Sequence, residues 1–127
     1  MAHGVSLMRI RLELARTADF PDGSASHGYE LVVPLKADGH VDAEGWHKVK
    51  ELCHVTRFWG DTPEARGMVV HTRHGWLFEY GASDEEPIFK LDRHQFVPGD
   101  YVSITEHDGV QRPFKVVSVI SAMSPPG

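Results

Sequence analysis

The residues best suited to recognition chemistry lie in the middle of the chain, in two short aromatic segments that each contain an arginine. The first segment ends in three consecutive large side chains, and the second surrounds a glycine turn. Arginine and tryptophan are enriched in binding hot spots. We therefore predict a ligand or partner patch on five residues, which are Arg57, Phe58, Trp59, Arg73 and Trp76. The alternative for the first segment is a strand end whose tryptophan closes the core.

The second segment predicts a β-hairpin of residues 67–72 and 76–80, with a two-residue loop at His74-Gly75. This loop places six side chains on one face, namely Val69, His71, Arg73, Trp76, Phe78 and Tyr80. Such a face would suit base stacking, which makes single-stranded nucleic-acid binding an alternative function. A core face is favoured, because aromatic side chains usually contribute burial first. The net charge of −5 also argues against nucleic acid as the main partner.

Histidine is plentiful, with nine residues, and His71 and His74 are the candidate metal ligands. The candidate metal is Zn²⁺, which requires a tetrahedral set of ligands. A spacing of three on a regular strand points two side chains to opposite faces, so only the turn at His74 would bring this pair together. The sequence contains no HExxH or CxxC motif. A small His-ligated metal-dependent enzyme, or a metal-binding protein, is therefore an alternative and not the favoured function.

Cys53 is the only cysteine, which excludes a disulfide within the chain. It is followed directly by His54, and the side chains of adjacent residues diverge, which opposes a nucleophilic Cys–His pair. We find no other catalytic constellation in the sequence and no evident cofactor requirement. We therefore expect a protein that is not an enzyme.

The elements that must position these residues are short strands separated by turns. Alternating apolar residues predict strands over 8–16, 29–35, 54–59, 67–72, 76–80 and 88–91, with loops over 17–28 and 60–66 and an acidic turn over 81–87. Asp42 predicts the start of a helix over 43–53 that packs Trp46 on the sheet. The fold expected is mainly β with one short helix, as a small antiparallel barrel or a strongly curled sheet of about six to eight strands.

The last hairpin gives the clearest register. Asp108-Gly109 is a strong hairpin signal. A three-residue loop over 107–109 places Val102 and Ile104 on the face of Phe114 and Val116, whereas a two-residue loop does not. We therefore predict the three-residue loop, with Gly109 at positive φ. The order of turn, strand, hairpin and strand from Pro98 onward resembles part of many small barrels, including translation-factor-type barrels, and this resemblance implies no activity.

The totals suit one domain that buries a core without disulfides. We expect a loose leader over 1–7, a single β-rich domain over 8–120 and a disordered tail over 121–127. No apolar run approaches the length of a membrane span, so a cytoplasmic location is the default expectation. The favoured function is a small β-barrel-like binding or interaction module. Its partner would be another protein or a small molecule, and not a membrane.

Overall fold

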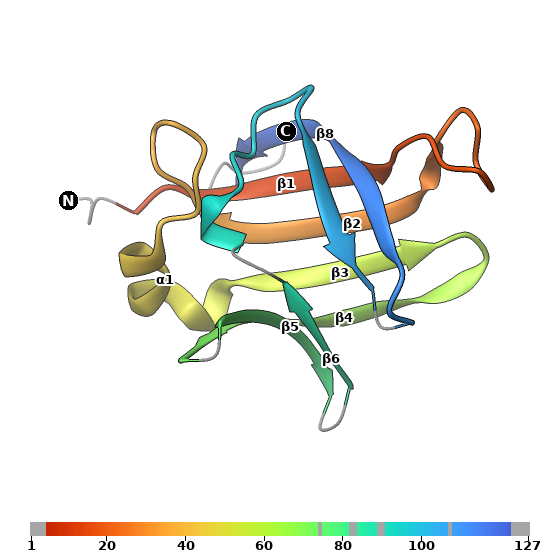
Figure 1. Ribbon diagram of the computed structural model, residues 1–127. Helices are drawn as coiled ribbons and strands as arrows, with labels where there is room; N and C mark the ends of the chain where they lie inside the picture. The colour runs from red at the N-terminus through yellow and green to blue at the C-terminus, as the bar shows by residue number, and fades with distance from the viewer. Residues whose placement is uncertain (1–4, 74, 82–83, 89–90, 107, 123–127) are drawn as a thin grey trace.

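The computed structural model describes residues 5–73, 75–81, 84–88, 91–106 and 108–122 (Figure 1). The strands are β1 (Leu7–Leu14), β2 (Ser24–Pro34), β3 (His54–Trp59), β4 (Thr62–Thr72), β5 (Gly75–Gly81), β6 (Asp84–Ile88), β7 (Tyr101–Thr105) and β8 (Gln111–Ser121). One α-helix, α1 (Ala43–Val49), runs into a 3₁₀ turn, η1 (Lys50–Leu52), and a second 3₁₀ turn, η2 (Leu91–Arg93), precedes β7.

All eight of these strands belong to one antiparallel sheet, in the order β6-β5-β4-β3-β2-β1-β8-β7. The sheet curls strongly into a half-barrel, as Figure 1 shows. Within the described residues no strand pairing joins β6 to β7, so these two strands are its edges. The predicted fold class, a mainly β protein with one short helix and a strongly curled antiparallel sheet, is confirmed.

The core fills the concave side of the sheet, because alternate residues of each strand point inward. On β1 and β2 this pattern buries Ile10, Leu12, Tyr29, Leu31 and Val33 completely. Helix α1 covers one end of the sheet (Figure 1). As predicted, it begins at Asp42, whose Oδ1 accepts a hydrogen bond from the Gly45 amide at 3.0 Å. Its buried Trp46 donates from Nε1 to the Val69 carbonyl at 2.9 Å.

The β7–β8 hairpin has the predicted register. Val102 pairs with Phe114, and the Glu106 amide donates to the Val110 carbonyl at 3.0 Å, which closes a loop over 107–109. Gly109 has φ +82°, as expected. His107 itself lies outside the described residues. The loop length thus places the inward row of β7 against the inward row of β8.

The β4–β5 hairpin corrects a prediction. His71 pairs with Trp76, and Thr72 pairs with Gly75, so Gly75 belongs to β5 and not to the loop. The Thr72 hydroxyl donates to the Gly75 carbonyl at 3.1 Å, which closes the turn one residue earlier than expected. This register stacks His71 flat on Trp76, with ring centroids 4.0 Å apart. The predicted two-residue loop would pair His71 with Phe78, so the observed register differs by two residues. A shift of two residues keeps Val69, His71, Trp76 and Phe78 on one face, whereas Arg73 lies in the turn.

Three strands also extend into segments that were predicted to be loops. β2 begins at Ser24, and β6 occupies most of the expected acidic turn. β4 begins at Thr62, which pairs with Trp59 across a tight turn in which Gly60 has φ +61°. A tight turn therefore replaces the loop predicted between β3 and β4, whereas the connection between β1 and β2 still spans residues 15–23.

The ends of the chain are tied to the sheet as far as the structure describes them. The Ala122 amide donates to the Leu7 carbonyl at 2.9 Å, and the Leu35 amide donates to the Ser6 carbonyl at 3.0 Å. Residues 1–4 of the predicted leader and 123–127 of the predicted tail lie outside the described residues. Among the residues described, no helix has the length and apolar character needed to cross a membrane.

Candidate functional site

A buried carboxylate lies at the centre of the main polar cluster of the concave face. The side chain of Glu106 is fully buried. Its Oε2 accepts hydrogen bonds from the Tyr29 hydroxyl at 2.6 Å and from Arg57 Nε at 3.0 Å. Its Oε1 accepts a hydrogen bond from Arg112 Nη1 at 2.7 Å. Strands β2, β3 and β8 thus supply three donors that compensate the buried charge.

Strand register explains why these side chains meet. Tyr29 pairs with Arg57 across β2 and β3, and Ile104 pairs with Arg112 across β7 and β8. Residues paired in this way project to the same side of an antiparallel sheet. Glu106 follows Ile104 by two positions, so it continues the inward row of β7. Each polar group therefore occupies an inward position that an apolar residue would otherwise fill.

The two arginines are held differently. Arg112 also donates to Asp108, through Nη1 to Oδ1 at 3.2 Å and through Nη2 to Oδ2 at 3.1 Å. The hydrogen bond with Asp108 raises the pKa of Arg112, and Glu106 adds to this effect. Burial opposes the charge on Arg57, but the hydrogen bond and charge of Glu106 raise its pKa overall. Both guanidiniums are therefore fixed cations, balanced by two carboxylates.

Trp59 lies over this ion cluster and is half-buried. The guanidinium carbon of Arg57 is 4.2 Å from the centroid of the Trp59 ring, and that of Arg112 is 5.6 Å away. His27 meets the ring edge-on, with centroids 4.6 Å apart. The Ser24 hydroxyl lies 2.7 Å from Nδ1 of His27 and orients that ring. We call His27, Arg57, Trp59 and Arg112 the Trp59 patch.

The structure brings together only two of the five residues predicted for a binding patch, Arg57 and Trp59. Phe58 points to the convex side, where the Arg11 guanidinium lies 4.4 Å from its ring. Arg73 is exposed in the β4–β5 turn. Trp76 is buried in the core, and no hydrogen-bond partner of its indole nitrogen is found among the described residues. The predicted patch is thus spread over separate parts of the fold.

The predicted metal ligands are only partly described. His71 is half-buried, stacked on Trp76, with its ring centroid 5.9 Å from that of Trp46. His74 lies outside the described residues. In the described ranges, no group of three or more His, Cys, Asp or Glu side chains is placed to hold a metal ion. The arrangement around His71 is that of a ring packed against aromatic neighbours.

Four participants in the cluster were not predicted from the sequence: Tyr29, His27, Glu106 and Arg112. A signal for two of them was present in the predicted hairpin. Once the loop is 107–109, Glu106 shares the face of Ile104, and Arg112 shares the face of Phe114. A charged residue on an otherwise apolar face is buried, and its charge must be compensated by a buried partner.

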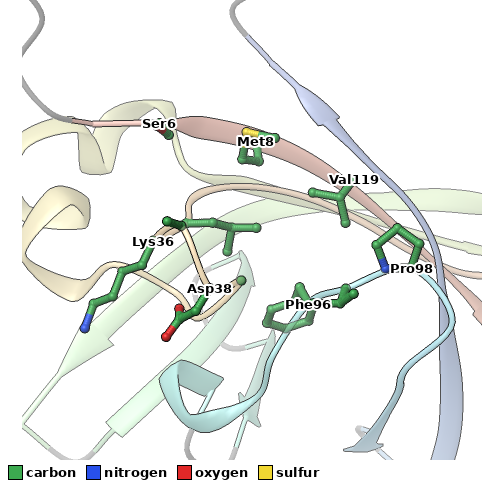
Figure 2. A pocket seen from close by; sticks show the side chains of 11 residues that line it. Ser6, Met8, Lys36, Asp38, Phe96, Pro98 and Val119 are labelled. Carbon is green, nitrogen blue, oxygen red and sulfur yellow. The ribbon is translucent and has the colours of Figure 1, made fainter.

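A pocket of about 400 Å³ lies near the other end of β1, where Met8 pairs with Val33. Figure 2 shows Met8 and Val119 on one side of the hollow, and Phe96 and Pro98 on the other. Residues 35–39 complete its lining, together with Ser6 and Val97. The Trp59 patch lies toward the opposite end of the sheet, since Tyr29 pairs with Leu12. The two features are therefore separate.

Comparison of the chain with protein-family models, with curated proteins and with solved structures gave no match. The function is therefore inferred from the geometry of the chain's own residues.

Proposed function

We propose that the protein is a non-enzymatic binding module whose ligand docks on the Trp59 patch. The observation that carries this proposal is that Glu106 accepts hydrogen bonds from both Arg57 and Arg112, beside the half-buried ring of Trp59. Side chains held in place before binding lose little conformational entropy when a ligand arrives. An arginine and a tryptophan in contact are also a frequent pair in binding hot spots.

The chemistry of the patch favours a planar or aromatic ligand that carries one carboxylate or phosphate group. Arg57 uses Nε for Glu106, whereas Arg112 uses both terminal nitrogens for carboxylates. A guanidinium has five N–H donors, so Arg57 retains capacity for an acceptor on the ligand. The ring of Trp59 would pack against the planar part of the ligand.

The overall charge of the protein argues against a ligand with many negative charges. The chain has a net charge of −5. A nucleic-acid strand depends on many phosphate contacts with a basic surface, and the two arginines of the patch are already balanced by Glu106 and Asp108. Because the two cations are already balanced, the patch can accept a single acidic group, on a small molecule or on one side chain of a partner protein, more readily than a polyanion.

Nuclear magnetic resonance of the indole N–H groups tests the proposal. The chain has three tryptophans, and Trp59→Phe assigns the signal of Trp59. The probes are benzoate, phenyl phosphate and a short single-stranded oligonucleotide. We expect benzoate or phenyl phosphate to shift the Trp59 signal saturably, with a smaller shift from the oligonucleotide at equal concentration. No shift of the Trp59 signal with either small anion would reject the proposal.

A further inference from the structure

We propose that the pocket of about 400 Å³ between β1, β8 and residues 96–98 binds one small aliphatic carboxylate, with its hydrocarbon part in the hollow and its acid group at the rim near Lys36. This inference does not depend on the Trp59 patch. The volume lies within the range of about 300–1,000 Å³ that is typical of small-molecule sites.

Part of the hollow is lined by apolar side chains, because two inward-facing rows end there without a covering side chain. Met8 precedes Ile10 on the inward row of β1, and Val119 pairs with Ile10 across β8. Both are only half-buried, although they pack against the core. On the other side Phe96 is buried, whereas Val97 is 38% exposed. An aliphatic chain in the hollow would remove apolar surface from water on both sides.

The walls of the pocket are held in place by hydrogen bonds that lie outside the hollow itself. The Phe96 amide donates to the Gly39 carbonyl at 2.8 Å, and the Gly99 amide donates to the Val116 carbonyl at 2.8 Å. The Gln95 side chain donates from Nε2 to the Asp38 carbonyl at 2.6 Å. The loop over 95–99 is thus attached both to the 36–39 turn and to β8. A pocket formed in advance binds without the cost of ordering its walls.

The rim carries a lysine and a carboxylate that is already engaged. Oδ1 of Asp38 lies 3.0 Å from Nδ1 of His40 and accepts from the His40 amide at 3.1 Å. This backbone hydrogen bond is the main cause that lowers the pKa of Asp38, and Lys36 adds a smaller effect. No ion pair of Lys36 is found among the described residues.

Figure 2 shows the Lys36 side chain running away from the hollow. It is exposed, and its flexible stem allows the ammonium to turn toward a bound acid group. A carboxylate is therefore the favoured head group. An ammonium head would be repelled by Lys36, and Oδ1 of Asp38 is already taken by His40, which leaves only Oδ2 of that carboxylate for it.

The test compares three probes with the same chain length, namely hexanoate, hexanol and hexylamine, by following methyl signals in nuclear magnetic resonance. We expect hexanoate to shift the signals of Met8, Val97 and Val119 saturably, with weaker binding of hexanol and the weakest binding of hexylamine. Lys36→Gln is expected to reduce the affinity for hexanoate to that for hexanol. Absence of shifts with every probe, or an unchanged affinity for hexanoate in Lys36→Gln, would overturn the proposal.

Val97→Ser and Val117→Ser form a matched pair, because these valines are 38% and 37% exposed and only Val97 lines the pocket. Val97→Ser is expected to weaken hexanoate binding at least about fivefold, since an apolar group is lost from the site, while Val117→Ser leaves it unchanged. Equal effects of the two substitutions would contradict the site. Trp59→Ala should leave hexanoate binding intact, so failure at this pocket and failure at the Trp59 patch are distinguishable.

Discussion

The Nε atom of Arg57 lies 3.0 Å from Oε2 of Glu106, although the two residues are 49 positions apart in the chain. This contact joins β3, in the middle of the sheet, to the end of β7, which is an edge strand. Arg112 and Tyr29 bind the same carboxylate from β8 and β2. One side chain therefore holds the β7 edge against the middle of the sheet and fixes the cations beside Trp59.

Removing this carboxylate should destabilise the fold strongly. Glu106→Ala leaves Arg57, Arg112 and Tyr29 without their shared acceptor, and loss of one member of a buried ion cluster typically costs about 3–5 kcal/mol. We expect a loss of about 3 kcal/mol or more in the free energy of unfolding, measured with urea at pH 7. Glu106→Gln keeps the shape and one acceptor oxygen and should cost less. A loss below about 1 kcal/mol in Glu106→Ala would show that the cluster is solvated and not buried.

The β7–β8 turn gives a backbone prediction. Gly109 has φ +82°, and a Cβ atom there would meet nothing within 4 Å. The cost of Gly109→Val is thus conformational and not steric crowding, and should be at least about 1 kcal/mol. Gly81→Val is the control, because Gly81 is equally open and its φ lies outside the positive range. Equal unfolding free energies for the two variants would contradict a three-residue loop that requires Gly109 at positive φ.

The two hairpins differ in how much of their register could be predicted from sequence, for a physical reason. For β7–β8, a three-residue loop places Val102 on the same face as Phe114, whereas a two-residue loop places the two on opposite faces. Burial of both side chains therefore decided between the two loop lengths. For β4–β5, the predicted loop and the observed loop place His71 and Trp76 on the same face, so burial could not choose. The Thr72 hydroxyl bond to Gly75 fixes the turn there, and a local bond of this kind is not visible in a hydrophobic pattern.

The site could be predicted only in part for a similar reason. Arg57 and Trp59 were identified because of their types and their proximity in the sequence. Their partners Glu106 and Arg112 come from a hairpin at the far end of the sheet order, and strand order cannot be derived from alternation alone. Phe58 was included with them because adjacency in sequence ignores the alternation of faces, which directs it to the convex side.

Cys53 provides a prediction about pH. Burial, followed by the charge of Glu51, raises the pKa of the Cys53 thiol from 9.0 to about 12. The folded state therefore favours the neutral thiol, while the unfolded chain ionises near the ordinary value. The resulting stability is fully present below pH 9 and is lost as the pH rises from there toward 12. Unfolding free energies measured upward from pH 9 should fall more steeply in the native sequence than in Cys53→Ala.

Thiol reactivity supplies a second measurement for this residue. Cys53 is fully buried, and its Sγ lies 3.4 Å from the Val49 carbonyl. At pH 8 the folded protein should react with a disulfide reagent far more slowly than the protein in denaturant, because the thiolate is the reactive form. Similar rates in the two states would mean that the thiol is accessible and its pKa is not raised.

The affinity for benzoate in three matched proteins tests the central claim most directly. Trp59 and Phe58 are neighbours on β3, both are aromatic and half-buried, and they point to opposite faces. We predict that Trp59→Ala weakens benzoate binding at least about tenfold, as expected for a hot-spot residue, whereas Phe58→Ala changes it little. Trp59→Leu replaces Trp59→Ala if circular dichroism shows that the latter is unfolded. Equal affinities in the native protein and in the folded Trp59 variant would contradict a ligand site on the Trp59 patch.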